Sequence, residues 1–188
     1  MPMKRQVLFI QGGGERVHDE WDDKLVASLR TELGPGYNIR YPRMPNERDP
    51  SYAAWAAALE NEIARLDEGA IVVGHSVGGT ILIHALAEHP PERELGAIVL
   101  IAAPFVGEGG WPSDEWTPQR ALGEKLPRGV PIYLYHGLAD TTAPPSHAEL
   151  YAHEIPDADL RRLPDRDHQL NNDLSEVAAL IRSLTAKA

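Results

Sequence analysis

Short apolar segments alternate with longer amphipathic segments along most of the chain. Six apolar runs have the length of strands, at residues 7–10, 37–41, 71–73, 97–101, 131–136 and 160–163. In other stretches apolar residues recur every three or four positions, which predicts helices over residues 21–33, 52–66, from about 77 onwards, and 174–184. Strands that alternate with helices predict right-handed crossovers and a parallel sheet covered on both faces. We therefore expect a three-layer α/β/α fold around a six-stranded parallel sheet.

The length and composition of the chain are those of one globular unit. It has 188 residues, 43% of them hydrophobic and 24% charged, and we expect a single domain over residues 1–188. No apolar run approaches the ~18 residues that span a membrane, and the opening run of residues 7–10 is shorter than the ~7 to 15 residues of a signal peptide. With no cysteine in the chain, these features predict a cytoplasmic protein that has no membrane partner.

The charge of the chain excludes one class of partner. The formal net charge is −10, whereas nonspecific binding to nucleic acid depends on Lys and Arg that neutralise phosphates. We therefore predict that the protein does not bind nucleic acid. The acidic excess is typical of a solvated surface that aids solubility.

One glycine-rich stretch joins a predicted strand directly to a predicted helix. Residues 74–78 have the sequence GHSVG, which matches the G-x-S-x-G pattern of a nucleophile elbow in the context that this pattern requires. The serine of such an elbow has a strained backbone, so small residues at Gly74 and Gly78 avoid clashes in a crowded turn. Ser76 is therefore a candidate nucleophile, although the pattern alone also suits an ordinary turn between a strand and a helix.

A serine hydroxyl needs a histidine to take its proton and a carboxylate to orient that histidine. Asp140 follows the fifth predicted strand, and His168 lies between the sixth strand and the last helix. The order Ser76, Asp140, His168 is the one expected for a nucleophile elbow and its two partners. Asp165 and Asp167 are alternatives for the carboxylate, and we prefer Asp140 because of its place in this order.

The three motifs together resemble those of the α/β-hydrolase superfamily. More narrowly, the short length, the GHSVGG elbow, the HGLAD loop and the DHQLNND segment resemble the small serine hydrolases related to retinoblastoma-binding protein 9. The resemblance covers nearly the whole chain. It implies a minimal α/β-hydrolase fold, which lacks the two leading antiparallel strands and has no large cap domain.

The resemblance also implies an oxyanion hole made of two backbone N–H groups. One is that of Val77, the residue after the candidate nucleophile, and the other belongs to the loop after the first strand. This loop has the sequence QGGG, with Gln11 where the superfamily often has histidine. We expect Gly13 to supply the second N–H, with Gly12 as the alternative.

Other chemistry finds little support in the sequence. A dinucleotide fingerprint that starts at Gly12 would need Gly or Ala where the chain has Val17, and no phosphate-binding loop with Gly-Lys-Ser or Gly-Lys-Thr is present. Residues 165–176 resemble a calcium loop at three positions, but Leu170 stands where the sharp turn needs glycine. No H-E-x-x-H pattern occurs. We predict neither a metal nor a cofactor.

These observations predict a serine hydrolase of the carboxylesterase class (EC 3.1.1). The substrate would be a small molecule with a carboxylic ester, with an amide as the second choice, and the reaction would pass through an acyl-enzyme. Aromatic residues that could line the substrate pocket are Trp21, Phe105, Trp111 and Trp116. The alternative is a non-catalytic or weakly catalytic protein of the same fold that acts by binding a protein partner.

Overall fold

The sheet has the predicted architecture. The computed structural model describes residues 4–115 and 118–186. Its strands form one six-stranded sheet in the order β2-β1-β3-β4-β5-β6, and each neighbouring pair is parallel. The strands are β1 (Arg5–Ile10), β2 (Tyr37–Arg40), β3 (Ile71–His75), β4 (Ala97–Ile101), β5 (Ile132–Gly137) and β6 (Asp159–Leu163). The predicted six-stranded parallel sheet is thus confirmed, with boundaries that shift by one or two residues.

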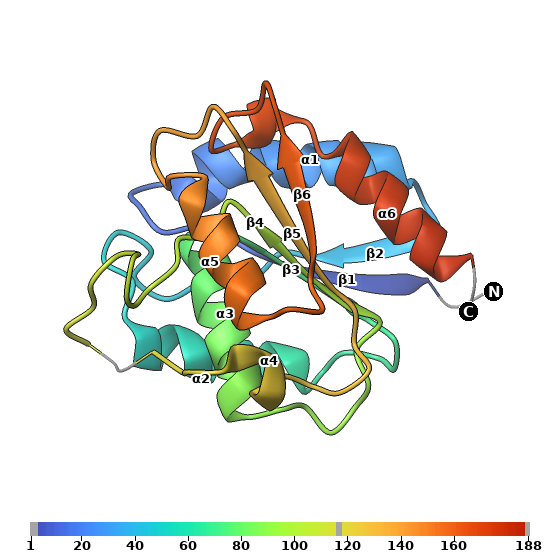
Figure 1. The fold of residues 1–188 in the computed structure, drawn as a ribbon. Coiled ribbons are helices and arrows are strands. Elements are labelled where there is room, and N and C mark those ends of the chain that lie inside the picture. The colour runs from blue at the N-terminus through green and yellow to red at the C-terminus, as the bar shows by residue number, and fades with distance from the viewer. Residues whose placement is uncertain (1–3, 116–117, 187–188) are drawn as a thin grey trace.

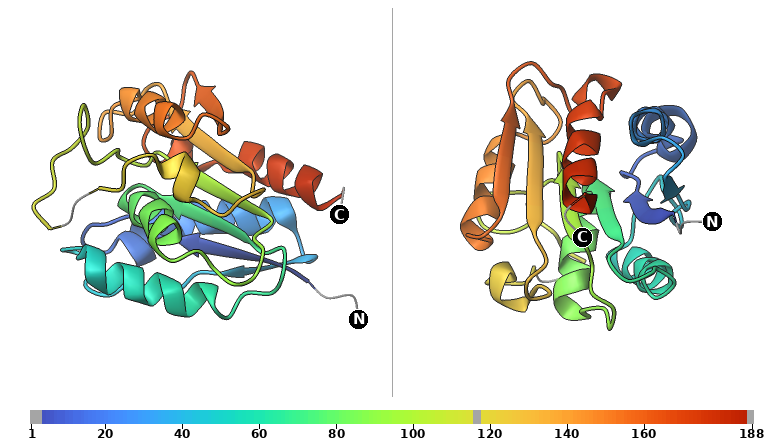
Figure 2. Two further views of the ribbon diagram at one scale, coloured as in Figure 1. Left: turned by 60° about the horizontal axis from the view of Figure 1, so that its bottom comes forward. Right: turned by 90° about the vertical axis from the view of Figure 1, so that its right-hand side faces the viewer.

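Helices cover both faces of this sheet, as Figures 1 and 2 show. On one face lie α1 (Asp22–Leu33) and α6 (Ser175–Thr185), which pack on one apolar cluster. On the other face lie α2 (Tyr52–Ile63), α3 (Val77–Glu88), α4 (Leu122–Lys125) and α5 (Ser146–Glu154), which pack on a second cluster. Successive strand residues belong to alternate clusters, for example Val72 and Val73. The three-layer arrangement follows because side chains alternate between the faces of a strand.

The central part of the sheet explains the continuous apolar runs in the sequence. Every residue of β3 and β4 is buried, because helices cover both of their faces. Helix α3 is also buried over most of its length, from Gly78 to Ala87, so apolar residues surround it on nearly all sides. The first residue of α3 follows β3 after one intervening residue, Ser76.

Helix α5 was not among the predicted helices. Pro144 and Pro145 precede it, and a pair of prolines in the sequence is typical of a loop. A proline is nevertheless tolerated at the start of a helix, and α5 begins directly after Pro145. The helix is held by packing, since Ala148 and Tyr151 are buried against the sheet.

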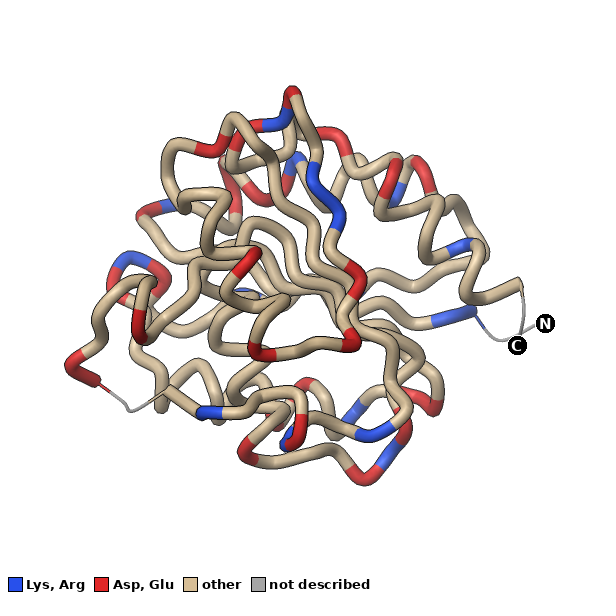
Figure 3. The backbone as a smooth tube through the Cα atoms, in the orientation of Figure 1, with Lys and Arg blue, Asp and Glu red and all other residues tan. Residues whose placement is uncertain are grey.

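Two short turns of helix flank the carboxyl edge of the sheet. A π-helical turn, η1 (Val17–Trp21), leads into α1, and a 3₁₀ turn, η2 (Leu170–Asn172), precedes α6. Charged residues of both signs are interspersed over the loops and helices at the periphery, as Figure 3 shows. Within the parts of the chain that the structure describes, no helix combines the length and apolar character needed to cross a membrane.

Candidate active site

The site lies at the carboxyl ends of the parallel strands, where open α/β sheets commonly bind ligands. Ser76 stands between β3 and α3 with φ 52° and ψ −133°, a conformation that L residues rarely adopt. Its backbone N–H donates to the carbonyl of Ile101 at 2.8 Å, which anchors the turn to the neighbouring strand β4. The structure therefore gives Ser76, which is half-buried, the strained turn that the G-x-S-x-G pattern predicts.

Close packing around this turn explains its glycines. A Cβ atom on Gly74 would lie 2.5 Å from the Cα of Gly79, and one on Gly78 would lie 1.9 Å from the carbonyl oxygen of Gln11. Both contacts are with backbone, which cannot move aside as a flexible side chain can. The first turn of α3 thus packs directly against β3 and the loop after β1, and this contact fixes the position of Ser76.

The ring of His168 lies between two side chains and is within hydrogen-bond distance of both, those of Ser76 and Asp140. The Nε2 atom of His168 is 2.9 Å from the Oγ of Ser76, and the Nδ1 atom is 2.7 Å from the Oδ2 of Asp140. The three residues come from loops after β3, β5 and β6, at separations of up to 92 positions in the sequence. The structure thus brings together the three residues that the sequence analysis selected, in the geometry of a nucleophile, a base and an orienting group.

The carboxylate of Asp140 is fully buried and surrounded by donors. Its Oδ1 accepts the backbone N–H groups of Thr142 and Ala143 at 2.8 and 2.9 Å, and its Oδ2 lies 3.2 Å from the Nε2 of His136. Burial alone would raise the pKa of Asp140, but the hydrogen bonds from His136 and His168 outweigh it and hold the pKa well below its usual range. Asp140 is therefore a fixed negative charge beside His168.

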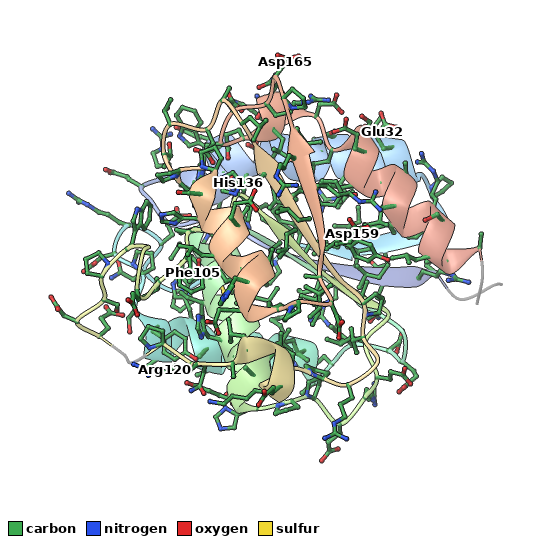
Figure 4. All side chains as sticks on the ribbon, viewed as in Figure 1. Glu32, Phe105, Arg120, His136, Asp159 and Asp165 are labelled. Atoms are coloured by element: carbon green, nitrogen blue, oxygen red, sulfur yellow. The ribbon has the colours of Figure 1, made fainter. Side chains whose placement is uncertain are left out.

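The two alternative carboxylates have other roles. Asp167 Oδ1 accepts the backbone N–H groups of Gln169 and Asn171, which closes the turn around His168. Asp165 lies at the outer tip of the loop after β6, as Figure 4 shows. Asp140 is therefore the carboxylate on the far nitrogen of His168. In residues 4–115 and 118–186 there is also no group of three His, Cys, Asp or Glu side chains placed to hold a metal ion.

The loop after β1 contains both candidates for the second oxyanion donor, Gly12 and Gly13. The Gly12 N–H donates to Asp22 Oδ2 at 2.7 Å, and the Gly14 N–H donates to the carbonyl of Glu47 at 2.7 Å. The Gly13 N–H has no acceptor among the described residues. Its neighbour across the site is Val77, since a Cβ on Gly13 would lie 2.8 Å from the Val77 Cγ1. This geometry favours Gly13 over Gly12 as an oxyanion donor, together with Val77, whose N–H has no acceptor within its own helix.

Two pockets adjoin this point. The first, of about 330 Å³, is lined by Ser76 and His168 together with Trp21, Thr141 and Thr142, among others. The second, of about 190 Å³, is lined mainly by apolar groups, among them those of Pro50, Val77, Ile81, Val106 and Trp111. Gly13 lines the first pocket and Val77 the second, so the candidate oxyanion donors lie at the boundary between the two.

The predicted aromatic lining is only partly right. Trp21 lines the first pocket and is 54% exposed, and Trp111 lines the second. Phe105 differs from the expectation: it lines neither pocket and is buried edge-on against Tyr151, because it belongs to the apolar core beneath α5. Trp116 lies outside the described residues.

The sequence analysis missed a buried pair next to the serine. His75, which precedes Ser76, has its Nδ1 atom 2.9 Å from the Oδ2 of Asp22, the first residue of α1. Burial of Asp22 and His75 is nearly complete, with side-chain exposures of 0% and 2%. Nothing in a single sequence links two residues 53 positions apart, and an Asp at a helix start is common for other reasons.

The chain belongs to the α/β-hydrolase family, because the model of that family, described as "Alpha/beta hydrolase family", matches residues 7–186. Among individual proteins, the chain is similar to the serine hydrolase RBBP9 of Rattus norvegicus, with 25% identity over 195 residues. That alignment covers all of this chain and 98% of the relative. The resemblance inferred from the motifs is thereby confirmed.

Solved structures agree on the fold. The ydeN gene product of B. subtilis matches with a TM-score of 0.76 at 20% identity, over 97% of this chain and all of that chain. The monoacylglycerol lipase of Paleococcus ferrophilus matches with a TM-score of 0.69 at 17% identity, over 97% of this chain and 95% of that one. The fold is therefore a compact α/β-hydrolase fold without a large cap domain.

Proposed function

We propose that the protein is a serine hydrolase that cleaves carboxylic esters of small molecules through an acyl-enzyme. The observation that carries this proposal is the line of contacts from Ser76 Oγ through His168 to Asp140, at 2.9 and 2.7 Å. Membership of the α/β-hydrolase family and similarity to a rat serine hydrolase support it.

In the first half of the reaction, Ser76 Oγ attacks the carbonyl carbon of the ester. His168 Nε2 takes the serine proton, and Asp140 keeps the other ring nitrogen protonated and stabilises the imidazolium that forms. The tetrahedral intermediate then collapses: the bond to the alcohol breaks, and His168 returns the proton to the departing oxygen. The products of this half are an alcohol and an ester of Ser76.

In the second half, water replaces the alcohol. His168 Nε2 removes a proton from water, whose oxygen attacks the acyl carbon, and the bond to Ser76 Oγ breaks as the serine regains its proton. The N–H groups of Val77 and Gly13 stabilise the oxyanion in both halves. Loss of one such donor typically costs about 100- to 1,000-fold in rate.

The two pockets favour a small substrate whose acyl and alcohol portions differ in size and polarity. The second pocket, near 190 Å³ and lined by Pro50, Ile81 and Val106, suits a short apolar acyl chain. The first pocket is larger and includes the hydroxyl-bearing Thr141 and Thr142, so it suits a more polar alcohol portion. An ester is preferred over an amide because an alcohol is a better leaving group than an amine. Release of long acyl chains in preference to short ones would contradict this assignment.

Replacement of Ser76 by alanine tests the proposal directly. The Ser76→Ala variant should lose nearly all hydrolysis of p-nitrophenyl acetate and butyrate, and a fluorophosphonate probe should label Ser76 in the unchanged protein and nothing in the variant. A matched control is Ser146→Ala, which removes an exposed hydroxyl in the first turn of α5. Full activity of Ser76→Ala, or labelling of another residue, would show that the mechanism is wrong.

The strained backbone of Ser76 argues against a protein that only binds a partner. A binding protein has no need for a nucleophile held at φ 52°, which costs stability. A chain that the probe does not label, yet that captures a specific protein, would favour this other function.

A further inference from the structure

A second Asp and His pair lies beneath the first pocket, and all of its polar atoms are engaged. Asp22 Oδ2 accepts the Gly12 N–H at 2.7 Å and lies 2.9 Å from His75 Nδ1, while Asp22 Oδ1 accepts from Gln169 Nε2 at 3.1 Å. The other nitrogen of His75, Nε2, lies 2.9 Å from the backbone carbonyl oxygen of His168. The proposed mechanism assigns no step to this pair.

The partners of His75 determine its protonation. A backbone carbonyl oxygen can only accept, so His75 Nε2 must carry a proton. The donors Gly12 and Gln169 on the two oxygens of Asp22 favour its ionised form, and beside an ionised carboxylate His75 Nδ1 carries a proton as well. A histidine with protons on both nitrogens is an imidazolium. The contacts thus define a buried ion pair between Asp22 and His75.

The charges around the pair agree with this assignment. Burial alone would lower the pKa of His75, but Asp22 and, more distantly, Asp140 outweigh it and raise that pKa above 6.5. Burial alone would raise the pKa of Asp22, but His75 and the donors Gly12 and Gln169 outweigh it and lower that pKa. Other titratable groups near the pair are His168, whose ring centroid is 5.1 Å from that of His75, and Tyr41, whose pKa is raised by burial and by the charge of Asp22.

We propose that the Asp22–His75 ion pair positions three catalytic segments relative to one another: the loop after β1, the turn at Ser76 and the loop that carries His168. This inference rests on the proposed serine hydrolase function. Asp22 binds the Gly12 N–H in the loop after β1, His75 is joined directly to Ser76, and His75 also binds the backbone of His168. One pair therefore connects the oxyanion loop, the nucleophile and the general base.

Two consequences for the reaction follow from these contacts. Because Asp22 occupies the Gly12 N–H, the adjacent peptide of Gly13 is the one left to face the oxyanion. His168 is held at two points, its side chain by Asp140 and its backbone by His75, so the ring has little freedom to leave Ser76. Misplacement of reacting groups by ~1 Å can cost about 100-fold in rate, so such anchoring affects kcat more than substrate binding.

The protonation of His75 can be measured without any assay of activity. Nitrogen-detected NMR of the histidine side chains should show both ring nitrogens of His75 protonated at pH 8, where a histidine with the ordinary pKa of ~6.5 is neutral. The signal is assigned to His75 through scalar couplings to its own backbone in the unchanged protein. A His75 that carries a single proton at pH 8 in the unchanged protein would overturn the proposal, even if the variants do not fold.

Kinetics then test whether the pair positions the catalytic segments. Asp22→Asn keeps the shape of the side chain but removes its charge, so it should lower kcat by about 10- to 100-fold while KM changes much less. His75→Gln should give a similar loss, and the double variant should lose little more than either single variant, because the two residues act as one unit. Values of kcat within twofold of the unchanged protein for both single variants would overturn the positioning role.

A control separates positioning from general loss of an ion pair. Glu62→Gln removes the carboxylate that pairs with Arg40. The Glu62 side chain is 18% exposed and lies in the last turn of α2, away from both pockets. It should leave kcat unchanged, and thermal unfolding of all variants shows how much protein is folded. Retained hydrolysis in Ser76→Ala would refute the proposed function, whereas the NMR result for His75 would stand regardless.

Discussion

The strained backbone of Ser76 predicts that the protein becomes more stable when this residue is glycine rather than alanine. Both Ser76→Ala and Ser76→Gly remove the hydroxyl and its contact with His168, so that loss cancels between the two variants. Alanine retains the Cβ atom that makes φ 52° and ψ −133° unfavourable, and glycine does not. The comparison therefore isolates the cost of the backbone conformation.

The size of the difference follows from two opposing terms. A residue in such a sparsely populated region costs ~1 to 3 kcal/mol, and glycine relieves this cost. The greater freedom of glycine in the unfolded chain offsets ~0.5 to 1 kcal/mol of that gain. Ser76→Gly should thus be more stable than Ser76→Ala by up to about 2.5 kcal/mol, which corresponds to a difference in Tm of up to roughly 10 °C for a chain of this size.

Urea unfolding and differential scanning calorimetry of the two variants measure this difference. The slope of the unfolding free energy against urea should be the same for both, because the exposed surface is the same. Gly36→Ala is a suitable reference, since its new Cβ meets no atom within 4 Å and its φ is ordinary. A Ser76→Gly variant less stable than Ser76→Ala would refute the claim that the turn is strained.

Four further predictions concern the residues of the site. Asp140→Asn should lower kcat by about 10⁴-fold, because an amide does not hold the His168 ring in the required tautomer, as steady-state kinetics will show. The pKa of Asp140 in the folded protein lies below its ordinary value of 3.8, so ionised Asp140 stabilises the fold fully above pH 3.8, and this stabilisation is lost as the pH falls through the folded-state pKa. Unfolding curves of the unchanged protein and of Asp140→Asn across pH will reveal this loss. Gly78→Ala should destabilise the protein by at least ~1 to 3 kcal/mol, since its Cβ would lie 1.9 Å from a backbone oxygen; an unchanged urea midpoint would contradict this packing. Trp111→Ala should enlarge the second pocket and shift the preferred acyl chain to greater length, a shift that a panel of p-nitrophenyl esters detects and that a chain-length profile identical to the unchanged protein would rule out.

The order of strands and helices could be predicted because their signals are local. Runs such as AIVLIA at residues 97–102 are apolar throughout, and only a strand buried on both faces or a buried helix needs such a run. The triad residues could be selected for a related reason: each follows a predicted strand, and parallel strands end at the same edge of the sheet. Helix α5 lacked a local signal, because two prolines precede it and tertiary packing holds Tyr151 in place.

The environment of the site could not be predicted, because it depends on contacts between distant segments. His75 stood out only as a neighbour of Ser76, and its partner Asp22 lies 53 positions earlier in the chain. The choice between Gly12 and Gly13 likewise depended on which N–H group Asp22 occupies. Phe105 was predicted to line the pocket from its residue type, but the path of the chain after β4 directs it into the core.

The separation of the site residues along the chain has a consequence for biosynthesis. His168 lies 92 positions after Ser76, and a ribosome adding about 5 to 20 residues per second needs roughly 5 to 18 s to cover that distance. Throughout this interval the nascent chain contains Ser76 but lacks His168, and for most of the interval it also lacks β6. Under the proposed mechanism, hydrolysis needs His168, which the pairing of β6 with β5 brings to the edge of the sheet, so the growing polypeptide would carry an unreactive Ser76 hydroxyl until its sheet is complete.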